Sequence, residues 1–211
     1  MTQEKYILMK RSKFLFAIVF VLCVYGCKSQ KKENPNTLGS TNFYIEKISF
    51  KEDITTLFGK NKYYKTSIKE SNASDIAFNY IVSKKENQNI RISLGNIDLS
   101  TYKYDFKISK DNKIIGVSTS FVSKENMRDK IIQNIDDQFK KNRININQLY
   151  KDPAVYRWEA PDKIIHFTYS SFEGDHIYNI SVVNKNFSCD TFPLEQVFVG
   201  EDICLKKYTK K

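Results

Sequence analysis

Apolar side chains alternate with polar or smaller ones in several short stretches of the chain, which is the period of a strand buried on one face. The clearest stretch is 101–108, where tyrosine, phenylalanine and isoleucine alternate with threonine, lysine and aspartate. Turn residues such as Lys110-Asp111-Asn112 separate neighbouring stretches, which favours antiparallel pairing. The same pattern predicts strands at 76–82 and 90–94. Further strands are predicted at roughly 113–122, after the turn residues 110–112, then at 154–159, 163–172 and 176–184, and one near 196–199 in an otherwise irregular C-terminal segment.

One long helix is predicted at about 124–141. Its apolar residues recur every four positions, which places them on one helical face. Ser123 is positioned to cap this helix, and Lys140 and Lys141 suit its negative end. The apolar stripe consists of Met127, Ile131, Ile135 and Phe139, widened by Ile132.

A short helix is predicted at about 50–58. Ser49 and Glu52 have the Ser-x-x-Glu spacing of a capping box, in which two side chains satisfy the first backbone N–H groups. Gly59 stands where a glycine commonly ends a helix.

The order of these elements predicts an α+β fold. A helix followed by strands occurs twice, so we expect antiparallel sheets built from two strand–helix–strands modules, 42–122 and 123–207, within one domain at 42–207. The first module, whose helix ends in Leu57-Phe58-Gly59-Lys60, resembles the helix-plus-meander modules of bacterial envelope lipoproteins and β-lactamase-inhibitor-like domains. The resemblance is one of element order, so no functional residue is carried over from it.

The N-terminal 26 residues have the composition of an export signal. Basic residues precede twelve apolar residues at 14–25. As a helix this run would be about 18 Å long, well short of the ~30 Å hydrocarbon core of a membrane. The length therefore favours the apolar region of a signal peptide at 1–26, with either Met1 or Met9 as the start.

The apolar run ends in Val24-Tyr25-Gly26-Cys27, which resembles the lipobox of bacterial lipoproteins. Tyr25 departs from the family pattern, which prefers a small residue there. Cys23 fits less well, because Leu22 before it is bulky. The resemblance implies that Cys27 is acylated and becomes the mature N-terminus; the alternatives are an ordinary secretory signal and a retained anchor.

The resemblance also implies a location. The residue after the lipobox cysteine is Lys28 and not aspartate, which favours the outer membrane of a Gram-negative bacterium. Acidic residues do not cluster after it, which favours an orientation facing the periplasm. Residues 27–41 are polar and contain one aliphatic side chain, so we expect a tether between the lipid bilayer and the domain.

Two cysteines remain once Cys23 and Cys27 are set aside. Cys189 and Cys204 are separated by 14 residues, and an oxidising compartment favours a disulfide between them. The alternatives are two buried thiols or a redox pair, although the Cys-x-x-Cys spacing typical of redox pairs does not occur.

Composition and charge narrow the function classes further. The chain carries 34 basic and 24 acidic residues, a net charge of +10, and removal of residues 1–26 leaves about +7. Acidic residues are interspersed among the lysines throughout, and no Arg/Lys cluster is interleaved with aromatics as a nucleic-acid footprint would require, so no nucleic-acid partner is predicted. Seven scattered glycines form no phosphate-binding loop.

Candidate catalytic and metal-binding residues are few. The two histidines are His166 and His176, and only His176 has acids close in sequence, in the turn Glu173-Gly174-Asp175. Such turn acids are usually solvated, so no metal and no cofactor is predicted. Ser170 and Ser171 lie in a strand without an evident general base, so no catalytic residue is predicted.

Tyr63 and Tyr64 are the candidate partner contacts. Lysines flank them, which is unusual for core aromatics, and aromatic side chains supply large rigid contact areas. We therefore expect a membrane-anchored, non-enzymatic binding or scaffold module of the cell envelope. One alternative is a periplasmic inhibitor or immunity lipoprotein, and a second is a cryptic hydrolase.

Overall fold

The structure, a computed structural model, describes residues 36–38, 42–69, 74–144, 154–198 and 203–204. The expected signal peptide, Cys27 and most of the expected tether lie outside these residues. The described end of the tether contacts the domain: the backbone N–H of Leu38 donates to the carbonyl oxygen of Leu57 at 2.9 Å, and the Leu38 side chain is buried.

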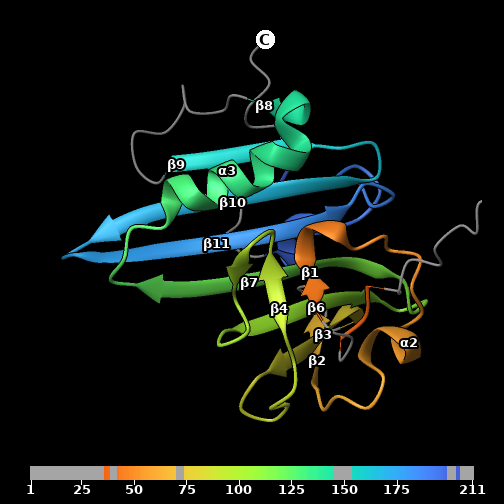
Figure 1. Cartoon of the computed structure of the whole chain (residues 1–211). Coiled ribbons are helices and arrows are strands. Elements are labelled where there is room, and N and C mark those ends of the chain that lie inside the picture. Colours follow the sequence, from red (N-terminus) through yellow and green to blue (C-terminus); the bar gives the residue numbers. More distant parts are fainter. Residues whose placement is uncertain (1–35, 39–41, 70–73, 145–153, 199–202, 205–211) are drawn as a thin grey trace, which may run out of the picture. The chain divides into compact units, whose positions relative to one another are not determined.

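The main sheet has eight antiparallel strands in the order β2-β3-β6-β7-β11-β10-β9-β8 (Figure 1). Most of them are strands that the alternating pattern predicts. The strands are β2 (Tyr64–Lys69), β3 (Asp75–Ser83), β6 (Lys103–Ser109), β7 (Ile114–Ser123), β8 (Arg143–Ile144), β9 (Ala154–Glu159), β10 (Lys163–Phe172) and β11 (Asp175–Asn184).

Two modules share this sheet, which confirms the predicted fold class. Helix α2 (Ile54–Phe58) precedes β2, β3, β6 and β7, and helix α3 (Arg128–Phe139) precedes β8 to β11. The modules join where β7 pairs with β11, for example at Val117 opposite Val182. Backbone hydrogen bonds across this pair make the eight strands continuous.

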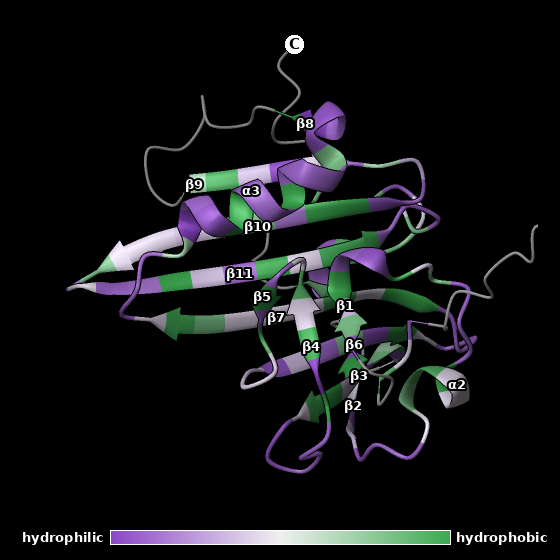
Figure 2. Cartoon of the chain, viewed as in Figure 1, coloured by the Kyte–Doolittle hydropathy of each residue, from purple (hydrophilic) through white to green (hydrophobic). Residues whose placement is uncertain are grey.

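One face of the sheet is covered by α3 and by a small second sheet (Figure 1). The second sheet consists of β1 (Phe43–Tyr44), β4 (Ile92–Leu94) and β5 (Ile97–Asp98), with the 3₁₀ helix η1 (Ile45–Lys47) after β1. The outer surface of α3 is largely hydrophilic (Figure 2). The core on this face includes the buried side chains of Tyr104, Phe106, Ile131, Ile135, Trp158, Phe167 and Tyr178.

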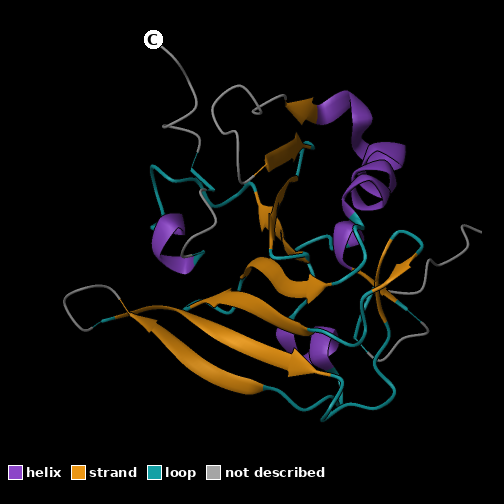
Figure 3. Ribbon diagram, turned by 90° about the vertical axis from the view of Figure 1, so that its left-hand side faces the viewer, coloured by secondary structure: helices purple, strands orange, loops and turns teal. Residues whose placement is uncertain are grey.

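The opposite face is covered in part by the C-terminal segment. Helix α4 (Leu194–Val197) lies on the other side of the sheet from α3 (Figure 3). Phe198 packs there so closely that a Cβ atom on Gly116 of β7 would lie 2.7 Å from its ring. This arrangement corrects the sequence-based expectation of a strand near 196–199, which is wrong.

Both predicted helices exist but are shorter than expected. Helix α2 begins at Ile54, where the Asp53 side chain accepts a hydrogen bond from the Thr56 N–H at 2.8 Å. The residues directly before Ile54 are not helical. The Lys163 ammonium donates to the Ile48 carbonyl at 2.5 Å, and Phe50 has a φ of 62°. A left-handed residue is incompatible with a continuous right-handed helix.

Helix α3 begins at Arg128, four residues later than expected, and Ser123, the expected cap, is the last residue of β7. The hydroxyl of Tyr178 accepts from the Met127 N–H at 2.7 Å and donates to the Glu125 carbonyl, so the sheet fixes the entry to the helix. The helix ends in a 3₁₀ turn, η2 (Lys140–Asn142), which leads directly into β8.

Candidate functional site

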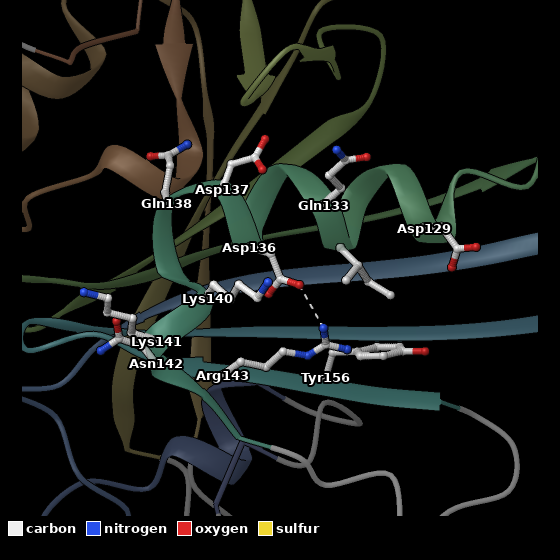
Figure 4. Close-up of a pocket in the computed structure, with 11 residues that line it drawn as sticks. Asp129, Gln133, Asp136, Asp137, Gln138, Lys140, Lys141, Asn142, Arg143 and Tyr156 are labelled. Carbon is white, nitrogen blue, oxygen red and sulfur yellow. Dashed lines mark hydrogen bonds and ion pairs between the residues drawn. The ribbon is translucent and has the colours of Figure 1, made fainter.

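An open groove of about 1000 Å³ lies between α3 and strand β9 (Figure 4). Helix α3 forms one wall, and η2 with the start of β8 closes one end. The lining residues are Asp129, Ile132, Gln133, Asp136, Asp137, Gln138, Lys140, Lys141, Asn142, Arg143 and Tyr156.

The groove follows from the helical period of α3. Ile131 and Ile135 are fully buried against the sheet, so residues one or two positions away lie beside the contact or point outward. Ile132 is half-buried and packs against the same core. With Tyr156 of β9 it gives the groove an apolar floor beneath a polar rim.

Asp136 is held in place by both of its carboxylate oxygens. Oδ1 accepts from the Trp158 indole N–H at 2.7 Å. Oδ2 accepts from the Arg143 guanidinium at 2.8 Å, which Figure 4 shows as a dashed line. Its side chain is 17% exposed. With one hydrogen bond to each oxygen, this carboxylate fixes the positions of the Trp158 and Arg143 side chains.

Arg143 lies over two aromatic rings. Its guanidinium carbon is 5.4 Å from the centre of the Tyr156 ring and 5.7 Å from that of Trp158. A guanidinium over the face of an aromatic ring is attracted by the ring quadrupole. Arg143, Tyr156 and the Asp136 ion pair thus form a preorganised surface of the kind that anchors protein contacts.

The rim carries charges of both signs. Asp129 pairs with Arg128 at 2.9 Å, and this contact raises the pKa of the Arg128 guanidinium. Asp137, Lys140 and Lys141 are exposed. The lining thus combines charged, amide, aromatic and aliphatic side chains.

The expected contact residues Tyr63 and Tyr64 are exposed, 43% and 60% respectively, but they lie in the first module and do not line the groove. The Tyr63 ring packs 4.9 Å from the rings of both Phe58 and Tyr80. A hydrogen bond with Glu86 raises the pKa of Tyr64.

The predicted disulfide between Cys189 and Cys204 is confirmed, with the two Cα atoms 5.8 Å apart. It connects the residues before α4 with a short described segment, Ile203-Cys204. The Ile203 carbonyl accepts from the Arg157 guanidinium at 2.8 Å. The bridge therefore holds this segment against the face of the sheet that α4 covers.

The two histidines lie apart. His166 in β10 is buried next to Ser181 and Arg157 in the strand pairing. His176 Nδ1 is 2.9 Å from the Tyr169 hydroxyl. Throughout the described ranges, His, Cys, Asp and Glu side chains do not gather in groups of three that could hold a metal ion.

Sequence reasoning did not identify the groove. The available signal was the polar side of the 124–141 helix, which includes Asp136 and Asp137. In the part of the chain that the structure describes, no helix is both long and apolar enough to cross a membrane. No protein-family model, no curated protein and no solved structure matches the chain.

Proposed function

We propose that this protein is a lipid-anchored, non-enzymatic binding module of the envelope of a Gram-negative bacterium, facing the periplasm from the outer membrane. The proposal depends on the motif Val24-Tyr25-Gly26-Cys27 after a basic segment and an apolar run. The disulfide Cys189–Cys204 supports it, because disulfides persist in oxidising compartments such as the periplasm.

The groove beside α3 is the proposed binding surface, and the proposed partner is a protein segment that carries apolar and charged side chains. Its apolar floor of Ile132 and Tyr156 would take an apolar side chain. Its rim, with Asp137 and Lys141 both exposed, offers charges of both signs to the flanking positions. Arg143 and Tyr156 are residue types enriched among the strongest contacts of protein interfaces.

Replacement of the lipobox cysteine tests the anchor. Cys27→Ser removes the thiol that would be acylated, so the protein should leave the membrane fraction and lose incorporation of a labelled fatty acid. Cys23→Ser is the matched control and should change neither property. Membrane retention and labelling of the Cys27→Ser protein would overturn the anchor.

Photocrosslinking in the native cell tests the groove. A photoreactive residue at Gln133, in the groove wall, should capture one defined partner protein. The same residue at Lys110, in the exposed β6–β7 turn, should not capture it, and Arg143→Glu should abolish the capture. Equal capture from both positions would contradict the proposal. Stoichiometric inhibition of a captured envelope enzyme would instead identify an inhibitor.

A further inference from the structure

A second concavity of about 390 Å³ lies on the other face of the main sheet, between β3, β6 and β7 and helix α4. It is separate from the groove beside α3 and shares no lining residue with it. Its lining residues are Ser67, Ile68, Asn79, Asp105, Lys107, Ser118, Thr119, Ser120, Gln196 and Val197. We refer to it as the polar cavity.

Strand pairing explains why polar groups meet there. Asn79 of β3 lies opposite Lys107 of β6, and Asp105 of β6 lies opposite Ser118 of β7. Residues two apart on a strand share a face, so Asp105 and Lys107 point to the same side, away from the α3 core. Ser120 extends the same face along β7.

This polar surface is not an ordinary solvated one. Lys107 and Ser118 are each only 7% exposed, and the Lys107 ammonium lies 5.8 Å from the centre of the Phe198 ring. Buried positions of this kind usually hold apolar side chains, as Ile115 and Val183 do further along the same face. Polar residues at buried positions need a compensating interaction.

Two acceptor atoms in the polar cavity lack that compensation. Asn79 Oδ1 and Asp105 Oδ1 are both buried, and neither accepts a hydrogen bond from the described protein. A buried acceptor without a donor costs about 1–3 kcal/mol, and a charged one costs more. Nearly all buried polar atoms in folded proteins have a partner, so we expect each of these oxygens to take a donor from outside the described residues.

The other lining groups restrict what that molecule can be. Asp105 and Lys107 give the cavity one charge of each sign, so a neutral molecule fits better than a cation, which Lys107 would repel. Ser118, Ser120 and Gln196 carry both donors and acceptors. A hydroxyl group can donate and accept a hydrogen bond at the same time. It can therefore donate to Asn79 Oδ1 or Asp105 Oδ1 and also bond to the serine and glutamine side chains.

We propose that the polar cavity is a binding site for a small, neutral, polyhydroxylated molecule of about monosaccharide size, with hydroxyl groups donating to Asn79 Oδ1 and Asp105 Oδ1. The volume lies within the roughly 300–1,000 Å³ typical of small-molecule sites. The site does not depend on the lipid anchor or on the groove beside α3. Its failure would therefore leave the proposed function intact.

NMR titration of the mature chain tests the site with three probes: D-glucose, glycerol and ethylammonium chloride. We expect D-glucose to bind saturably and to shift the backbone amide signals of 105–107 and 118–120, with glycerol weaker and ethylammonium without effect. Asn79→Leu should weaken D-glucose binding about tenfold, equivalent to ~1.4 kcal/mol. Ser170→Ala, on the same sheet face outside the cavity, should leave it unchanged.

Three results would overturn the inference: no saturable binding of either hydroxylated probe, which would indicate a cavity filled by water only; tighter binding of ethylammonium than of D-glucose; or shifts confined to residues outside the cavity. The amide shifts are measured on the unaltered protein. The test therefore gives a result even if Asn79→Leu fails to fold.

Discussion

A Cβ atom added to Gly95 would lie 2.2 Å from Oδ1 of Asn134. That oxygen accepts a hydrogen bond from the Asn96 N–H at 2.9 Å, and the Asn134 amide nitrogen donates to the Lys130 carbonyl at 2.8 Å. The contact fastens the β4–β5 turn to the middle of α3. Gly95 also has a φ of +55°, so both its backbone angle and its surroundings require glycine.

Gly95→Ala should therefore be strongly destabilising. The left-handed backbone alone costs an alanine roughly 1–2 kcal/mol, and displacement of Asn134 adds to this cost. Gly174→Ala is the matched control, because Gly174 also has a positive φ, of +79°, but has nothing within 4 Å of the added atom. Denaturant unfolding should show a larger loss for Gly95→Ala; equal losses would mean that the Asn134 contact contributes nothing.

Much of the main sheet could be predicted from short apolar stretches between turn signals. The ranges 154–159 and 163–172 coincide with β9 and β10, in which most side chains are buried whichever face of the sheet they point to. Strand β2 was not predicted. As an edge strand with one half-buried and five exposed side chains, it carries no burial pattern that sequence could reveal.

The helix ends and the groove could not be predicted, because they depend on contacts between distant residues. Lys163 holds the carbonyl oxygen of Ile48, 115 positions away, and so shortens the first helix. Trp158 meets Asp136 only because β8 pairs with β9 and turns the end of α3 toward the sheet. A local pattern identifies a polar helix face but not what lies opposite it.

Trp158→Phe tests whether the hydrogen bond from the Trp158 indole to the Asp136 carboxylate, at the edge of the groove, stabilises the fold. The substitution removes the indole N–H and leaves the Asp136 carboxylate with Arg143 as its charged partner. Loss of one hydrogen bond to a charged group should cost about 1.5–3 kcal/mol. Chemical unfolding measures this loss, and Asp137→Asn, at an exposed rim position, serves as the control and should cost little. An unchanged stability would show that the indole–carboxylate bond is not stabilising.

Tyr104 should give the fold a specific sensitivity to alkaline pH. Burial raises the pKa of its hydroxyl, which donates to the Leu99 carbonyl at 2.5 Å. In the unfolded chain a tyrosine ionises near pH 10. The stabilising contribution is therefore complete below about pH 10 and is lost as the pH rises above it, because only the unfolded state releases the proton there.

Tyr104→Phe should remove this dependence. At neutral pH the variant should be less stable by about 1 kcal/mol, the value of a lost hydrogen bond. Above about pH 10 the difference in unfolding free energy between the two proteins should shrink. Tyr63→Phe, at another exposed tyrosine, is the control for a general effect of losing one hydroxyl. A difference that stays constant with pH would contradict the assignment to Tyr104.

The disulfide Cys189–Cys204 should stabilise the fold mainly by reducing the conformational entropy of the unfolded chain. A closed loop of this size, with a sequence separation of 15, corresponds to about 3 kcal/mol in the chain-entropy model. The bridge also keeps the Ile203 carbonyl within 2.8 Å of the buried Arg157 guanidinium, which would otherwise lose a partner.

Reduction should lower the unfolding free energy of the wild-type protein by at least this loop term. It should have no effect on a Cys189→Ser, Cys204→Ser double variant, whose stability should match that of the reduced wild type. If reduction left the wild-type stability unchanged, the segment over Arg157 would be held by packing of α4 and not by the bridge.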